Sequence, residues 1–312
     1  LNDKKYFDFL SAYSSLNQGH CHPEVLKVLF NQASKLTLTS RAFYNNTLGE
    51  FEEFICSLFE YDKVLPMNSG VEAAESAVKL ARKWGYEKKG VKMNSAKIIF
   101  PKNNFWGRSI AAISSSTNPV AYNNFGPLLS GFEMIPYDDL NFLEEKLKNP
   151  DCVAFMLEPI QGEAGIIVPS DGYLTNVKYL CQKYNVLLIA DEIQTGLGRT
   201  GKMLATDYED VKPDILVLGK ALSGGMMPIS AVLASNEIML CLQPGEHGST
   251  FGGNPLSAKV AKKSIEIIIN EKLSENAFEL GCLFRKSLDD YISNSRIVKL
   301  IRGKGLLNGL VI

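Results

Sequence analysis

The sequence lacks several features that would point to particular classes of protein. Its 33 basic and 34 acidic side chains give a net charge of -1, so no global charge favours binding to nucleic acid or to an anionic membrane. No apolar run is long enough to span a bilayer. The first residues show no cationic head that leads into an apolar stretch. We therefore expect a protein that binds neither nucleic acid nor membrane.

Histidines and paired cysteines are scarce as well. The six cysteines form no C-x-x-C pair, which favours reduced thiols in an intracellular protein over a disulfide framework. Two of only three histidines flank Cys21, as His20 and His22. Tetrahedral zinc needs more ligands at suitable spacing, and Pro23 suits the first turn of a helix. We interpret this motif as structural and predict no metal site.

What the sequence does contain is an alternation of helix and strand patterns. Apolar residues of the segment 71–85 recur at helical spacing, and 174–185 also has the pattern of a helix. Short apolar runs predict strands at 96–100, 152–159, 186–193, 214–220 and 229–235. Strands that alternate with helices predict an α/β fold with a mainly parallel central sheet flanked by helices.

The pattern changes near residue 255. Two helix patterns, 256–269 and 274–293, are followed by strand patterns at 297–301 and 305–312. We interpret this part as the start of a smaller α+β domain that the chain does not complete. The predicted organisation is an N-terminal segment 1–35, a large domain 36–254 and the beginning of a small C-terminal domain 255–312.

Polar side chains follow three of the predicted strands, at the sheet edge where ligands bind in such folds. Glu158, Asp191 and Lys220 each stand at the end of a different strand. The glycine-bearing turn 68–72 offers free backbone N–H groups to a phosphate. This combination suits pyridoxal phosphate: the lysine forms a Schiff base, the carboxylate keeps the pyridine nitrogen protonated and the helix N-terminus holds the phosphate.

Each of these residues has an ordinary explanation when it is considered alone. Lys220 could extend its stem along the sheet edge and keep its amine in water. Asp191 could cap a helix or form a structural ion pair. Their joint placement, each at the end of its own strand, favours the cofactor site.

Longer motifs around these residues resemble a known family. The segments LLIADEIQTGLGRTG and LGKALSGG resemble the class III aminotransferases of fold type I. Further segments resemble the members of this family that act on ornithine; they are NQGHCHPEV, TLTSRAFYNN, VLPMNSGVEAAESAVKLARKWGY, NFWGRSIAAISSST, EPIQGEAGI, PGEHGSTFGGNP and RGKGLLN. The resemblance covers essentially the whole chain. It implies a pyridoxal 5′-phosphate enzyme that transfers the δ-amino group of L-ornithine to 2-oxoglutarate in ping-pong order.

The resemblance also implies a role for individual residues. Lys220 is expected to be the Schiff-base lysine and Asp191 the partner of the pyridine nitrogen. The other residues expected to hold the cofactor are Gln194 at the phenolic oxygen, Phe105 on the ring face, Gly70 and Val71 at the phosphate, and Ser249 and Thr250 at the phosphate of the neighbouring subunit. The last pair implies a homodimer with shared active sites.

Four residues are expected to contact or select the substrate. By resemblance, Arg108 binds the α-carboxylate, Tyr13 favours ornithine, and Glu163 masks a second arginine until 2-oxoglutarate binds. Trp106 is expected to pack beside the site, where it borders the substrate. The family places the second arginine after the last residue of this chain and a further substrate-contacting tyrosine before the first.

Two other interpretations of the function stay open. One is a different class III enzyme that acts on 4-aminobutyrate or N-acetylornithine; Tyr13 and the FWGR motif argue against it. The other is a non-catalytic homologue that keeps the fold for binding or assembly, and the intact Lys220, Asp191 and Gln194 argue against it. We expect a cytoplasmic enzyme, with the mitochondrial matrix as the alternative.

Overall fold

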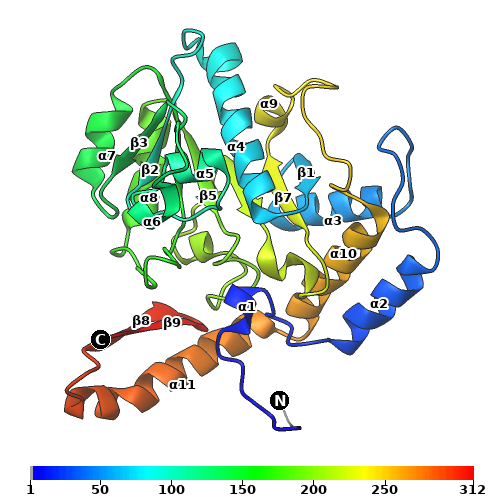
Figure 1. Ribbon diagram of the computed structural model, residues 1–312, viewed down its shortest axis with the longest axis vertical. Helices are drawn as coiled ribbons and strands as arrows, with labels where there is room; N and C mark the ends of the chain where they lie inside the picture. The colour runs from blue at the N-terminus through cyan, green and yellow to red at the C-terminus, as the bar shows by residue number, and fades with distance from the viewer. Residues whose placement is uncertain (1–2) are drawn as a thin grey trace.

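The computed structural model describes residues 3–312, and a seven-stranded sheet lies at its centre (Figure 1). The strand order is β1-β7-β6-β5-β4-β2-β3. The strands are β1 Lys63–Met67, β2 Lys97–Pro101, β3 Phe132–Ile135, β4 Cys152–Leu157, β5 Leu187–Asp191, β6 Ile215–Leu218 and β7 Ser230–Ala234. Only β7 runs antiparallel to its neighbours, β1 and β6. The predicted α/β fold with a mainly parallel sheet is confirmed.

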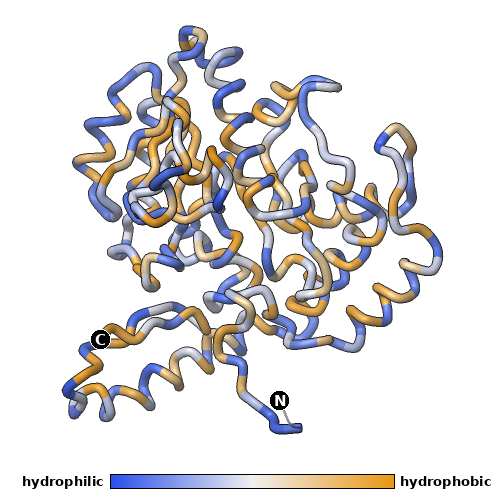
Figure 2. The backbone as a smooth tube through the Cα atoms, in the orientation of Figure 1, coloured by the Kyte–Doolittle hydropathy of each residue, from blue (hydrophilic) through white to orange (hydrophobic). Residues whose placement is uncertain are grey.

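Helices cover both faces of the sheet because its central strands are apolar on both sides. In β6, Ile215 and Val217 pack in the same core as α4, whereas Leu216 and Leu218 pack with α3 and α10. Figure 2 shows the resulting concentration of hydrophobic segments in the middle of the molecule. The helices are α1 Ser11–Ser14, α2 Pro23–Ala33, α3 Leu48–Phe59, α4 Gly70–Trp84, α5 Ile110–Ser114, α6 Pro119–Tyr122, α7 Leu140–Leu147, α8 Tyr173–Lys183, α9 Asn236–Met239, α10 Pro255–Asn270 and α11 Leu273–Asn294, with η1 Gly85–Lys89, η2 Ala205–Tyr208 and η3 Lys220–Ser223.

Helix α4 begins at a capping box that fixes its first turn. The Ser69 hydroxyl accepts the Glu72 amide, and the Glu72 carboxylate accepts the Ser69 amide. This reciprocal pairing satisfies two of the amides that every helix start leaves free. The buried alanines of α4 allow it to lie close to the sheet, so its N-terminus ends up at the carboxyl edge of the strands.

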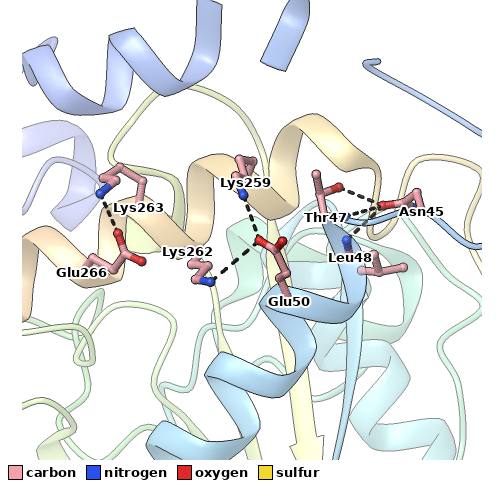
Figure 3. Close-up of polar contacts among 8 residues, drawn as sticks. All are labelled: Asn45, Thr47, Leu48, Glu50, Lys259, Lys262, Lys263 and Glu266. Atoms are coloured by element: carbon pink, nitrogen blue, oxygen red, sulfur yellow. Dashed lines mark hydrogen bonds and ion pairs between the residues drawn. The ribbon is translucent and has the colours of Figure 1, made fainter. Parts of the chain in front are cut away.

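Polar contacts join α10 to α3 (Figure 3). Glu50 of α3 pairs with Lys259 of α10 at 2.8 Å and lies 3.8 Å from Lys262. The start of α3 is held by Asn45, whose side-chain oxygen accepts the amides of Thr47 and Leu48. Ala261 and Ile265 of α10 pack in the same core as Leu216 of β6, so α10 also covers the large sheet. The predicted domain boundary at residue 255 stays a prediction.

A two-stranded hairpin ends the chain beside α11, below the large sheet in Figure 1. Its strands are β8 Leu300–Lys304 and β9 Leu307–Val311. The strand predicted at 297–301 was placed three residues too early. The reason is local: the Ser295 hydroxyl accepts the amides of Ile297 and Val298, so these apolar residues belong to a turn.

Candidate active site

The carboxyl ends of β4, β5 and β6 open on one cavity. Glu158, Asp191 and Lys220 line it. Asp191 is the last residue of β5, Glu158 directly follows β4, and Lys220 is the second residue after β6. The other lining residues are Gly70, Val71, Phe105, Trp106, Gly107, Ile193, Gln194 and Thr195. The structure thus brings together most of the residues that the sequence predicts to hold the cofactor.

Lys220 enters this cavity with a strained backbone and an unpaired amine. Its φ angle is 42°, in the left-handed region that residues with a side chain seldom adopt. Within residues 3–312 its amine takes part in no hydrogen bond or ion pair. Burial lowers the pKa of Lys220, although Asp191 and Glu163 act in the opposite direction. A partly dehydrated amine loses its proton more easily and is a better nucleophile near neutral pH.

Asp191 is the last residue of β5, and only 4% of its surface is exposed. One carboxylate oxygen accepts the Ile193 amide at 3.1 Å. Burial raises the pKa of Asp191 to about 7, against the opposing effect of this amide and of Lys220. A cation placed in the cavity would restore the ionised form, so the site fits a protonated ring nitrogen.

The N-terminus of α4 supplies an anion site at the same cavity. Within the described chain, the amides of Gly70 and Val71 have no acceptor. The neighbouring loop approaches so closely that a Cβ on Gly107, whose φ is +141°, would lie 2.4 Å from Val71 Cγ2. Two free amides and the positive end of a 15-residue helix suit a phosphate.

The adjacent aromatic residues Phe105 and Trp106 lie differently. Both line the cavity, but Phe105 is 37% exposed whereas Trp106 is 5% exposed. The Trp106 ring stacks on Phe100, with centroids 5.7 Å apart, and its Nε1 donates to the Ser115 hydroxyl at 2.7 Å. Most of Trp106 therefore belongs to the core. The exposed guanidinium of Arg108 lies 5.6 Å from the Phe105 ring centroid.

A second group of predicted residues meets at Gln194. The Gln194 amide lies 3.5 Å from the backbone oxygen of Tyr13 and 3.5 Å from a Glu163 carboxylate oxygen. Glu163 is exposed and the Tyr13 side chain is 57% exposed, so neither contributes to the lining of the cavity. These residues stand beside the cofactor cavity, where a substrate would approach.

Of the residues predicted to hold the cofactor, Ser249 and Thr250 are the two that the structure does not bring to the cavity. They line a shallow surface depression together with residues 38–41. The Ser249 hydroxyl accepts the Asn68 side-chain amide at 2.9 Å and the Gly252 amide at 3.0 Å. Their predicted contact with the phosphate of a neighbouring subunit is not tested by this chain and stays a prediction.

Two buried carboxylates near the cavity were not assigned a role from the sequence. Glu192 is 1% exposed and accepts the Thr206 amide at 2.8 Å and the Thr195 hydroxyl. Glu158 is 6% exposed and accepts the amides of Phe105 and Gly162. An acidic residue directly after an apolar strand is the signal that singles out Glu158, but one of its backbone partners, Phe105, lies 53 positions away in the sequence.

The His20-Cys21-His22 motif has a local structural role. His20 lies 2.8 Å from Asp8, and His22 caps α2 by accepting the Glu24 amide while its other nitrogen lies 3.1 Å from Glu271. Across the described part of the chain, no group of three or more histidine, cysteine and acidic side chains is arranged to hold a metal. None of the helices within residues 3–312 combines the length and apolar character needed to cross a bilayer.

The sequence of this chain is similar to a known protein family and to known enzymes. The profile of the family "Aminotransferase class-III" matches residues 1–311. The mitochondrial ornithine aminotransferase of Drosophila melanogaster is 62% identical over 309 residues, which cover 99% of this chain and 71% of the relative.

Two solved structures are similar as well. The ornithine aminotransferase of Toxoplasma gondii, in a structure described as having partial occupancy of PLP at the active site, has a TM-score of 0.99 and 53% identity. This match covers 99% of our chain and 74% of that chain. The acetylornithine aminotransferase of Elizabethkingia anophelis has a TM-score of 0.90 and 54% identity, and the match covers 100% of this chain and 76% of the other.

Proposed function

The chain belongs to the class III aminotransferases, and on this basis we propose that it transfers the δ-amino group of L-ornithine to 2-oxoglutarate. The products are glutamate 5-semialdehyde and glutamate, formed in two half-reactions in ping-pong order. The observation that carries the proposal is the unpaired Lys220 amine in the same cavity as the buried Asp191 carboxylate.

The residues of the cavity fit pyridoxal phosphate. When bound, this cofactor supplies an aldehyde that links to an amine and a ring that accepts the electron pair of a broken C–H bond. The ring-nitrogen partner is Asp191, and Gly70 and Val71 offer their free amides to the phosphate. Phe105 supplies the aromatic face and Gln194 a side-chain amide for the phenolic oxygen.

Lys220 moves the proton in each half-reaction. With its Nζ free, Lys220 would remove a proton from the substrate carbon that carries the δ-amino group. The protonated Nζ would then donate that proton on the cofactor side of the amino nitrogen and not back to the substrate carbon, so that the amino group would stay with the cofactor. Burial lowers the pKa of Lys220, which favours the neutral amine that the first step needs.

Substrate choice rests on residues outside the cofactor cavity. The exposed Arg108 guanidinium over the Phe105 ring can bind a carboxylate in bidentate geometry. For Glu163 and Tyr13 the support for a selecting role is their position beside Gln194, which contacts the Glu163 carboxylate and the Tyr13 backbone oxygen. Sequence identity to solved structures does not decide between ornithine and N-acetylornithine as the substrate, because the structures named for ornithine and for acetylornithine are about equally identical to this chain.

Exposed aromatic residues that follow, in the sequence, the two segments lining the depression at Ser249 support a homodimer with shared sites. Phe43, Tyr44 and Phe251 have exposed fractions of 69%, 106% and 56%, and exposed clusters of large apolar side chains mark interfaces. If a second copy of the chain covered this surface, Ser249 and Thr250 of the first copy would lie toward the cofactor phosphate of the second copy. For the compartment, the name of the Drosophila relative supports the mitochondrial alternative over the cytoplasm.

A half-reaction tests the function directly. The holoenzyme is mixed with L-ornithine in the absence of 2-oxoglutarate, and the cofactor absorbance is followed. We expect one equivalent of glutamate 5-semialdehyde per site, and recovery of the original spectrum when 2-oxoglutarate is added. Faster conversion of N-acetylornithine or 4-aminobutyrate would favour a different class III enzyme. A chain that binds the cofactor without reacting would favour the non-catalytic homologue.

A further inference from the structure

Glu158 is a buried carboxylate at the cofactor cavity that the proposed chemistry does not use. It follows β4 directly, and its two oxygens each accept a backbone amide. Oε1 accepts the Phe105 amide at 2.9 Å, and Oε2 accepts the Gly162 amide at 3.2 Å. One side chain therefore fixes two loops that are far apart in the sequence.

The first loop carries the exposed ring of Phe105. Its neighbours are anchored separately: Asn104 donates its side-chain amide to Ser115 O at 2.8 Å, and Trp106 donates to the Ser115 hydroxyl. The backbone amide of Phe105 itself is anchored by Glu158. The direction of the Phe105 ring, and of the Arg108 guanidinium above it, thus depends on this carboxylate.

The second loop determines where Gln194 lies. A Cβ on Gly162 would lie 1.6 Å from Gln194 Oε1, so the Gln194 side chain rests directly on the Gly162 backbone. The Gly162 carbonyl accepts the amides of Gly165 and Ile166 and closes the turn that carries Glu163. A shift of the Gly162 amide would therefore displace both Gln194 and Glu163.

The hydrogen bonds favour a holding role for Glu158 over a proton-transfer role. Both oxygens are occupied by backbone amides, and the buried Gly162 amide and the partly buried Phe105 amide each need an acceptor. Burial and the nearby Asp191 raise the pKa of Glu158, while the two amides lower it. No hydrogen bond joins Glu158 to Lys220 within residues 3–312.

We propose that Glu158 is a positioning residue that sets the Phe105 ring and the Gln194 amide for cofactor binding. The inference rests on the proposed function, because it assigns these two residues to the cofactor. It predicts that a change at Glu158 alters the affinity and the spectrum of the bound cofactor before it alters the fold.

Two substitutions at Glu158 test the two hydrogen bonds that its carboxylate accepts. Glu158→Gln keeps the size but turns one acceptor into a donor that faces a backbone N–H, and Glu158→Ala removes both acceptors. The cofactor is dissociated from the holoenzyme by dilution, and the apparent Kd and the visible circular dichroism are measured. We expect the Kd to rise about tenfold for Gln and about a hundredfold for Ala, at roughly one decade per lost hydrogen bond to a buried amide. The visible band should change shape, because the environment of the ring has changed.

Glu209 offers a matched control away from the cavity. Its carboxylate also accepts two backbone amides, those of Gly172 and Thr175, at 3.1 and 2.9 Å. Glu209→Gln should lower the thermal stability without changing the cofactor Kd or the visible band.

Three results would overturn the inference. They are a wild-type Kd and band for Glu158→Gln, equal effects of Glu158→Gln and Glu209→Gln, or a loss of kcat in Glu158→Gln at unchanged cofactor affinity. The last result would make Glu158 a proton-transfer group. A wild-type chain that formed no cofactor band would instead contradict the proposed function, so the two failures are distinguishable.

Discussion

Gln194 rests on Gly162 so closely that any side chain at position 162 would displace it, since an added Cβ would lie 1.6 Å from Gln194 Oε1. We therefore predict that Gly162→Ala weakens cofactor binding about tenfold, the equivalent of one lost hydrogen bond. Titration of the cofactor against the unloaded protein measures this. Gly49→Ala is the matched control, because an added Cβ there meets no atom within 4 Å. Equal cofactor affinity in the two variants would contradict the prediction.

Lys220→Ala should abolish turnover while the fold persists. The substitution removes both the amine that links to the cofactor and the group that moves the proton, so we expect the rate to fall by about a thousandfold or more. Because the Lys220 amine forms no hydrogen bond or ion pair in the described chain, its loss should leave the melting temperature of the unloaded protein nearly unchanged. Steady-state rates and thermal unfolding test both statements, and wild-type turnover would refute the role.

The unloaded protein should become less stable as the pH rises from 6.5 to 8. Burial raises the pKa of Asp191 from 3.8 to about 7 and that of Glu158 from 4.5 to about 8. Between the unfolded and folded values the folded state binds more protons, so its free energy of unfolding falls as the pH rises through this window. Two groups whose pKa values are lowered by burial oppose this trend: His247 does so only below its usual value of 6.5, and Lys220 is one group against the two carboxylates.

Thermal unfolding at pH 6.5, 7.2 and 8 measures this dependence. Asp191→Asn and Glu158→Gln each remove one of the titrating groups, so each variant should show a flatter pH profile than the wild type. A wild-type profile that is flat, or that rises with pH, would contradict the assignment of raised pKa values to these buried carboxylates.

Shared active sites predict complementation between two defective variants. Lys220→Ala removes the amine of its own subunit, and Thr250→Asp places a negative charge where the phosphate of the neighbouring subunit is expected. In a mixed dimer, one site combines the intact lysine of one chain with the intact threonine of the other. Random exchange of subunits should then restore about a quarter of the wild-type rate, because half the dimers are mixed and each has one sound site. A mixture that stays inactive after exchange would argue against shared sites.

The fold could be predicted from the sequence where strands are continuously apolar. The buried runs that form β4, β5, β6 and β7 gave a clear pattern, because each is covered on both faces. No strand was predicted at β1 or β3, which lie at the two edges of the sheet and carry partly exposed residues. Edge strands are half-polar and short, so their pattern is weak.

The candidate site was predictable where a residue sits on a strand end or a helix start. Lys220, Asp191 and Gly70 follow from such local patterns, since the ends of parallel strands meet at one edge of the sheet. The link from Glu158 to Phe105 and Gly162 was not predictable. It depends on backbone amides, which every residue has, and on a loop 53 positions away.

Replacing Arg108 with lysine should weaken ornithine binding without disabling the chemistry. Lysine keeps the charge but not the planar fork, so the bidentate contact with the α-carboxylate is lost. We expect the KM for ornithine to rise about tenfold with a smaller change in kcat, since one charge-assisted hydrogen bond disappears. Activity toward 1,4-diaminobutane, which has no carboxylate, should not change. The same substitution at the exposed residue Arg296, Arg296→Lys, serves as the control and should leave both activities unchanged. If both amines lose activity equally, Arg108 supports the site as a whole and does not select the carboxylate.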